Sequence, residues 1–216
     1  MKNSLFNPDN WLWRPFGKAA DFLVLSAFWI FTSIPIVTIG SALTALYDCS
    51  AHCVKNDEDG MFSRYFRTYR REFLPSMLSF LLWAVIIGVT FSLIRNFTTT
   101  ATPTTFHLIL AYAALFLLIL LVGIASWVFP LLSRFTFSVV DLNLTAIRLA
   151  IMHIPRTIAL GVCMSLTIWV CLRFWIPLMI APGMYGLLSA YILEPVFKKY
   201  EDSQKIENET EEIEIQ

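Results

Sequence analysis

The sequence predicts an all-α protein, a polytopic transmembrane helical bundle with four full spans and two short Pro/Gly-flanked helices. Hydrophobic residues make up 57% of the 216 residues, charged residues make up 15%, and the mean hydropathy is +0.65. A soluble domain carries about 25% charged residues. In addition, residues 96–133 contain no Asp, Glu, Lys or Arg. This stretch can hold two helices, because each needs about 20 residues to cross a bilayer.

The four full spans follow from where the charges fall. Residues 73–94 and 106–132 are uncharged and are separated by a polar loop. Residues 157–172 lie between two arginines and predict a third span. Residues 19–34 predict a fourth, which Pro35 ends because proline interrupts helical hydrogen bonding.

Two shorter apolar segments, 41–54 and 183–197, complicate the count and give five to six membrane segments in all. Each follows an Ile-Pro pair and has a glycine at or just before its first residue. These prolines and glycines form a helix-break motif: Pro35, Gly40, Pro177 and Gly183. Transporters often contain internal repeats with broken helices near the substrate site. The alternative is coincidence, since Pro and Gly are common in membrane helices.

Orientation is predicted from Lys and Arg, which concentrate on the cytoplasmic side. Residues 55–72 hold five of them and residues 134–156 hold three, so both segments and the C-terminus are predicted to be cytoplasmic. If residues 19–54 form a hairpin, the N-terminus is also cytoplasmic; if they cross once, it is outside. The charge distribution favours the hairpin. Asp48 and His52 disfavour it, because a buried carboxylate in the bilayer costs roughly 3 kcal/mol.

Residues 61–72 predict an amphipathic cytoplasmic helix. Its aromatic residues share one face, and its arginines lie elsewhere: Arg64, Arg67, Arg70 and Arg71. Such a helix suits the lipid interface, with arginines directed to phosphates. It serves either as a simple membrane anchor or as a docking surface for a partner or an anionic lipid.

Residues 141–153 predict a second short helix with Asp141 as its N-cap. It is either an interfacial elbow or a helix that couples to a partner. Residues 1–200 therefore form a single transmembrane domain. Residues 201–216 are rich in acids and predict a disordered cytoplasmic tail.

No phosphate-binding loop, zinc-protease motif or nucleophile elbow occurs in the sequence. We therefore expect no enzymatic activity and no cofactor. Cys49, His52 and Cys53 share one helical face, but one helix seldom supplies a closed metal site, so we predict no metal. Ionisable residues inside a membrane domain are candidates for function. The candidate intramembrane polar site consists of Asp48, His52 and Glu194.

Three segments resemble the YesL family of bacterial membrane proteins, a domain of unknown function. They are SIPIVTIGSALTALY at 33–47, FPLLSRF at 129–135 and LEPVFKKY at 193–200. The resemblance covers roughly residues 5–200, and the chain departs from it at Asp48, Cys49, His52 and Cys53.

Members of this family are often encoded beside carbohydrate transporters. The resemblance therefore implies an accessory partner of carbohydrate ABC transporter permeases in a bacterial plasma membrane. The alternative is a small-solute transporter or channel with its site at the broken helices. The long uncharged segments make the lipid bilayer an expected partner. The net charge is zero, so the chain lacks the basic excess of a nucleic-acid-binding protein, and we expect no nucleic acid partner.

Overall fold

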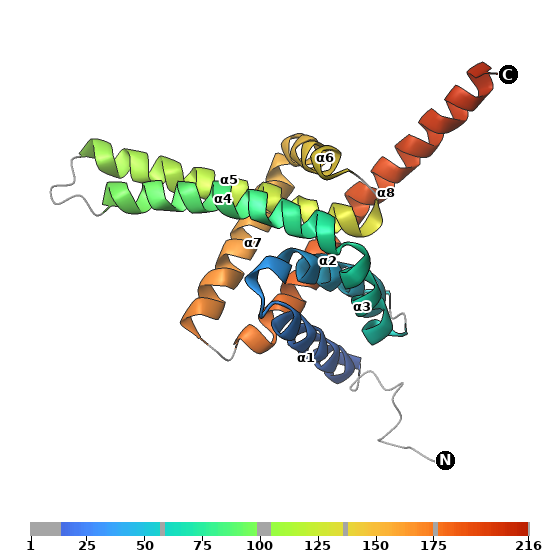
Figure 1. The fold of residues 1–216 in the computed structure, drawn as a ribbon, viewed down its shortest axis with the longest axis horizontal. Coiled ribbons are helices and arrows are strands. Elements are labelled where there is room, and N and C mark those ends of the chain that lie inside the picture. Colours follow the sequence, from blue (N-terminus) through green and yellow to red (C-terminus); the bar gives the residue numbers. More distant parts are fainter. Residues whose placement is uncertain (1–13, 57–58, 99–104, 136–137, 175–176, 216) are drawn as a thin grey trace, which may run out of the picture.

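A computed structural model of the chain describes residues 14–56, 59–98, 105–135, 138–174 and 177–215, without the side chains of 14–19 and 202–215. Every regular element in these ranges is a helix (Figure 1), so the predicted all-α class is confirmed. The residues before Arg14, on which the sidedness of the N-terminus depends, lie outside the described ranges.

Three helices are long and apolar enough to cross a membrane: α4 (Phe73–Thr98), α5 (Thr105–Arg134) and α7 (Ile154–Arg173). They occupy the places that the uncharged segments predict. The predicted fourth span corresponds to α1 (Arg14–Thr32), which is apolar only over Ala20–Thr32. This described apolar stretch is shorter than the other three helices.

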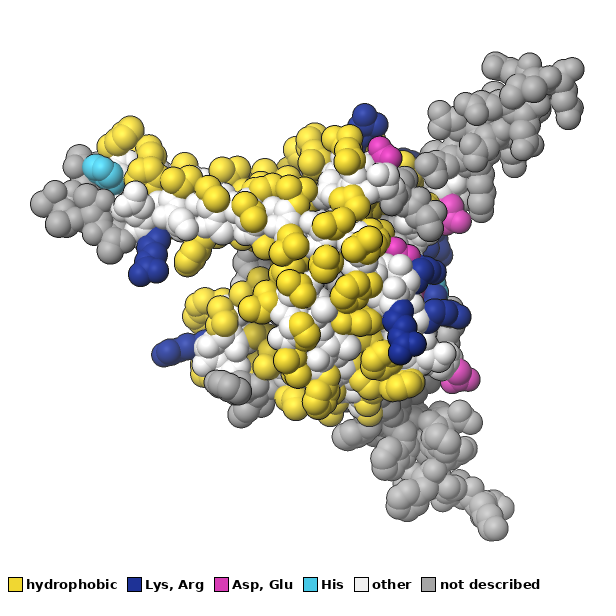
Figure 2. Space-filling view, in the orientation of Figure 1, with side chains coloured by type: hydrophobic (Ala, Val, Ile, Leu, Met, Phe, Trp, Pro, Cys, Tyr) yellow, Lys and Arg dark blue, Asp and Glu magenta, His cyan; other side chains and the backbone are white. Residues whose placement is uncertain are grey.

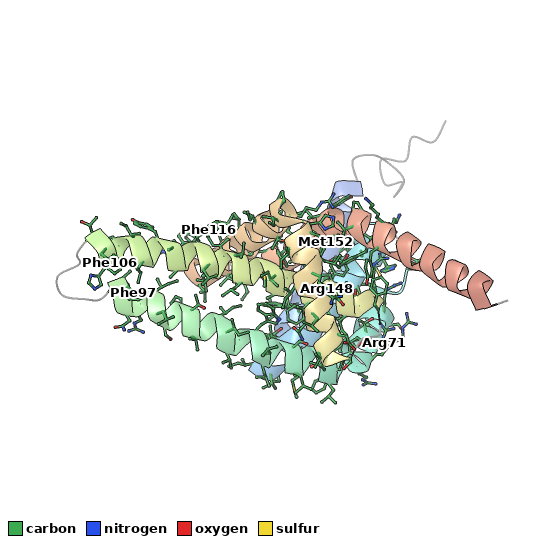
Figure 3. All side chains as sticks on the ribbon, turned by 90° about the horizontal axis from the view of Figure 1, so that it is seen from above. Arg71, Phe97, Phe106, Phe116, Arg148 and Met152 are labelled. Carbon is green, nitrogen blue, oxygen red and sulfur yellow. The ribbon has the colours of Figure 1, made fainter. Side chains whose placement is uncertain are left out.

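Helices α4 and α5 run side by side and project together from the rest of the chain (Figure 1). Phe97 and Phe106 mark the tip of this hairpin, and Arg71 lies at its opposite end (Figure 3). The surface of the hairpin is rich in exposed apolar side chains such as Val85 and Phe116, and Figure 2 shows hydrophobic atoms along its whole length. Such a surface suits contact with lipid.

Helix α2 (Ile39–Cys49) is enclosed by the bundle, and every residue in it except Ile39 is buried. It continues directly into a π-helical turn, η2 (Ser50–Val54). A short turn, η1 (Ile36–Thr38), separates it from α1; the Thr38 hydroxyl donates to the carbonyl oxygens of Thr32 and Pro35. A helix in this position can carry polar side chains only if neighbouring helices satisfy them.

The second break repeats this local arrangement. A 3-10 turn, η3 (Pro177–Met179), precedes α8 (Ala181–Ile215), as η1 precedes α2. The glycine near the start of each helix allows a close approach: a Cβ on Gly40 would overlap the Ser76 carbonyl of α4, and one on Gly183 would press on Phe22 of α1. The likeness concerns the turns alone, since the two glycines meet different neighbours.

Two shorter helices, α3 and α6, pack against the other helices. The aromatic face of α3 (Met61–Arg71) packs on α1, where the Phe28 ring meets those of Phe62, Tyr65 and Phe66. Helix α6 (Val139–Met152) is joined to α4, because the Trp83 indole donates to the Asn143 amide oxygen at 2.8 Å.

One prediction about a helix end is wrong. The residue before α6 is Ser138, so Asp141 lies in the first helical turn instead of at the N-cap. There its charge still favours the positive end of the helix dipole. The acidic tail was expected to be mostly disordered, with a frayed helix as the alternative, and the backbone of α8 continues through it to Ile215. Residues 196–215 contain no Pro or Gly and are rich in Glu and Lys, which are good helix formers.

Candidate polar site at the base of the helices

Asp48 lies on the last turn of α2 and is 5% exposed. Arg64 of α3 donates to both of its carboxylate oxygens, from Nε at 3.0 Å and from Nη2 at 3.3 Å. The Thr68 hydroxyl, one turn further along α3, donates at 2.7 Å. His52 Nδ1 lies 3.2 Å from Oδ1, the oxygen that also accepts from Arg64 Nη2, and 3.0 Å from the backbone carbonyl oxygen of Asp48. Four contacts from three side chains therefore hold this acid in its ionised form.

These contacts set the protonation of the pair. Burial alone would raise the pKa of Asp48, but the hydrogen bonds from His52, Arg64 and Thr68 outweigh it and lower this pKa to about 2. The hydrogen bond to Asp48 raises the pKa of His52, against the opposing effect of its partial burial. Neither residue belongs to α4, α5 or α7. Arg64 therefore neutralises the carboxylate of Asp48, and at lower pH the protonated imidazole of His52 does so as well.

Two further acids are buried beside this cluster, and each has its own arginine. Glu194 of α8 pairs with Arg134, the last residue of α5. Glu72, between α3 and α4, accepts a hydrogen bond of 2.5 Å from Arg71 Nε. Arg71 also donates to the carbonyl of Ser133 at 3.3 Å. Ion pairs thus connect α2 to α3 and α5 to α8, and a hydrogen bond joins α3 to α5.

A polar cavity of about 250 Å³ lies among these groups. Helix α3 contributes Arg64, Arg67 and Arg71, and α5 contributes Arg134. The remaining lining residues are Asp48, His52, Thr68, Ser133, Phe135 and Glu201. Arginine guanidinium groups from two helices therefore face one small space. Figure 2 shows Lys and Arg side chains gathered on this side of the molecule.

A second cavity, of about 670 Å³, lies between α2, α4, α5, α7 and α8. Its walls are almost entirely apolar and include Leu43, Phe80, Trp83 and Phe129. A cavity of this size is within the range of small-molecule sites. Its lining suits hydrocarbon and does not suit a sugar or an ion, whose polar groups would lose hydrogen bonds to water there.

The structure brings together the predicted polar residues Asp48 and His52 and joins them to Arg64 of the predicted basic helix. Glu194 belongs to the neighbouring pair with Arg134, and Arg67 lines the polar cavity. Arg70 is exposed and does not line it. Pro35, Gly40, Pro177 and Gly183 shape the two turns and line neither the Asp48 cluster nor this cavity.

Sequence reasoning missed three contributors to this region: Arg134, Glu72 and Thr68. A signal existed for Arg134, which is the first charge after the long uncharged segment. Thr68 lies within the arginine-rich helix α3 and Glu72 directly follows it, and sequence alone does not show which polar residues there turn inward.

Comparison with known proteins gives one match. Residues 22–92, which include α2, α3 and most of α4, match the family described as a protein of unknown function, DUF624. The matched segment contains Asp48, His52 and Arg64 but ends before Arg134 and Glu194. No curated protein and no solved structure matches the chain. The chain is therefore a helical, multi-pass membrane protein that contains a segment similar to a family of unknown function.

Proposed function

We propose that this chain is a member of the YesL family and a non-enzymatic accessory partner of a carbohydrate ABC transporter in a bacterial plasma membrane. The match over residues 22–92 to a domain of unknown function is consistent with that membership. The role in carbohydrate uptake is supported by the sequence resemblance described above.

We favour an accessory role over transport because the buried acids are already paired with arginines. Intramembrane acids often mark ion or proton pathways, and an acid in that role must release its protein partner to bind the solute or proton. Asp48 is held by Arg64, Thr68 and His52, and Glu194 is paired with Arg134. These acids join helices, and the larger cavity is apolar. Both observations favour a rigid membrane body that other proteins contact.

Co-purification tests this role. The full chain, tagged at its C-terminus, is expressed with carbohydrate ABC permeases from the same genome and is extracted in a mild detergent. We expect the permeases to co-purify and sugar uptake to fall when the gene is deleted. A membrane protein of similar size with the same tag is the control. Absence of the permeases from the purified fraction, together with unchanged uptake, would exclude the proposal.

The alternative, a small-solute transporter or channel, makes a different prediction. The purified chain alone in proteoliposomes would then move solute, and Asp48→Asn and Glu194→Gln would reduce the flux. We expect no flux above protein-free vesicles. Flux by the wild-type chain that both substitutions reduce would favour the alternative.

A further inference from the structure

The polar cavity has more hydrogen-bond donors than its acids use. Three arginines are paired with carboxylates: Arg64 with Asp48, Arg71 with Glu72, and Arg134 with Glu194. A guanidinium group has five N–H donors, and one carboxylate occupies at most two of them well. The pairs neutralise the buried acids. Arg64 has a further interaction of its own, and the guanidinium groups of Arg71 and Arg134 each have more N–H groups than a carboxylate occupies.

Arg67 adds a cation beyond these pairs. Its side chain is exposed and lines the cavity, and within the described part of the chain it makes no hydrogen bond or ion pair. Glu201 is the other acid in the lining besides Asp48, and it has an interaction of its own. Asp48 already accepts from Arg64, Thr68 and His52, so little of its negative charge remains to repel an anion.

Arg134 adds a guanidinium group from α5 to the lining of the cavity. Only 18% of its side chain is exposed, and its Nη2 donates a hydrogen bond to Glu194. This ion pair holds the guanidinium group in place before a ligand enters the cavity.

The arrangement fits an oxyanion with several acceptor oxygens. Arginines from two helices approach the space, and the planar fork of each guanidinium matches phosphate oxygens. A volume of about 250 Å³ is roughly eight times the volume of a water molecule in the liquid. This space accommodates a phosphate group with a few further atoms, and it is smaller than the sites of drug-sized ligands.

We propose that this cavity binds a phosphate group, with Arg67 as its principal donor and the guanidinium group of Arg134 beside it. The group comes either from an anionic phospholipid headgroup or from a free phosphate in solution. The proposal does not depend on the accessory role, because it rests on the donors around the cavity alone. It gives the basic helix α3 a defined ligand in addition to its position at the membrane interface.

Arg67→Gln is the direct test, and Arg70→Gln is its matched control. Both residues are exposed on α3 and both changes remove one charge, but only Arg67 lines the cavity. The purified full chain in a nonionic detergent is titrated with inorganic phosphate by calorimetry. In a second arm, phosphatidylglycerol is added to micelles that contain phosphatidylcholine, and the change in intrinsic fluorescence is followed.

We expect Arg67→Gln to weaken binding about tenfold, as removal of one charge-assisted hydrogen bond would, and Arg70→Gln to change it less than twofold. Binding of inorganic phosphate that depends on Arg67 identifies a free phosphate. Arg67-dependent binding in the phosphatidylglycerol arm alone identifies a headgroup. Equal losses in the two variants would show unspecific attraction and overturn the proposal, as would no binding of either probe. The thermal midpoint of each variant verifies that it is folded.

Discussion

Asp48 shows how a single residue can be buried in this bundle without losing its charge. A carboxylate in an apolar environment costs several kcal/mol unless it is paired and hydrogen-bonded. Arg64, Thr68 and His52 satisfy it from two elements, and two of them lie one turn apart on α3. The charge therefore fixes α3 against α2. His52 is the member of this cluster whose protonation changes near neutral pH.

The stability of the chain should depend on pH through His52. Contact with Asp48 raises the pKa of His52 in the folded state, so protonated His52 stabilises the fold. This stabilisation is fully present below the unfolded-state pKa of about 6.5 and is lost as the pH rises through the raised folded-state value. We expect the thermal midpoint in detergent to fall over this range.

His52→Gln is the comparison for this effect. Its midpoint should be lower than that of the wild type at pH 5.5 and should converge with it at pH 9, where His52 is neutral in both states. A wild-type decline that His52→Gln reproduces in full would show that another group is responsible.

The Arg134–Glu194 pair should be more costly to break than to replace. Glu194→Gln leaves the guanidinium of Arg134 largely buried without its counter-charge, and we expect a loss of about 3 kcal/mol in the free energy of unfolding. The double variant Arg134→Met with Glu194→Leu removes both charges and fills similar space. It should be more stable than Glu194→Gln alone.

Denaturant unfolding in mixed micelles measures these differences. The single variants Arg134→Met and Glu194→Leu and the double variant that combines them form a thermodynamic cycle with the wild type. If the losses of Arg134→Met and Glu194→Leu simply add in the double variant, the pair makes no coupled contribution and the ion-pair interpretation is wrong.

At the scale of elements, glycines decide how closely the long helices approach. A Cβ on Gly123 of α5 would overlap the Thr157 carbonyl of α7, and a Cβ on Gly161 of α7 would overlap the Ile119 carbonyl of α5. Small residues allow close backbone contact where lipid and side chains are equally apolar. Gly88 of α4 faces open space instead.

The crowded position of Gly161 and the open position of Gly88 predict different results for a substitution by alanine. Gly161→Ala should destabilise the chain by about 1–3 kcal/mol, because the added methyl group forces α5 and α7 apart. Gly88→Ala should stay within about 0.5 kcal/mol of the wild type, because nothing lies within 4 Å of its added Cβ. Unfolding midpoints in detergent compare the two. Equal losses would mean that helix flexibility, and not contact, sets the effect.

At the scale of the whole molecule, hydropathy predicts the long helices and little of what lies between them. The spans 73–94, 106–132 and 157–172 are recovered because the bilayer requires long apolar segments. The enclosure of α2 could not be predicted, since its apolar and small residues fit either a short span or a buried helix. The Asp48–Arg64 and Arg134–Glu194 pairs join residues 16 and 60 positions apart, and no periodicity reports such distances.

The tail shows a different limit. Its acids suggested solvation and disorder, whereas the absence of Pro and Gly and the helix-forming residues favour continuation of α8. Charge composition and helix propensity gave opposite expectations there, and in the structure the propensity prevails. By contrast, the aromatic periodicity of residues 61–72 predicted α3 well, because one face of this helix meets α1.

The arrangement of the whole chain across the membrane gives the last prediction. Lys and Arg are concentrated in 55–72, 134–156 and the C-terminal segment, and a cytoplasmic N-terminus places 14 of them inside against 2 outside. The pairing of Asp48 with Arg64 removes the main objection to this arrangement, because the carboxylate is not left unpaired in the bundle.

Single cysteines introduced into a chain without its four native cysteines test this topology in whole cells. With an impermeant maleimide, Thr100→Cys should be labelled in intact cells, because the tip between α4 and α5 is predicted to be outside. Asn3→Cys and Ser203→Cys should react only after permeabilisation. Labelling of Asn3→Cys in intact cells would place the N-terminus outside. Residues 19–54 would then cross the membrane once. This result would argue against an internal repeat that relates the Pro35 and Pro177 segments.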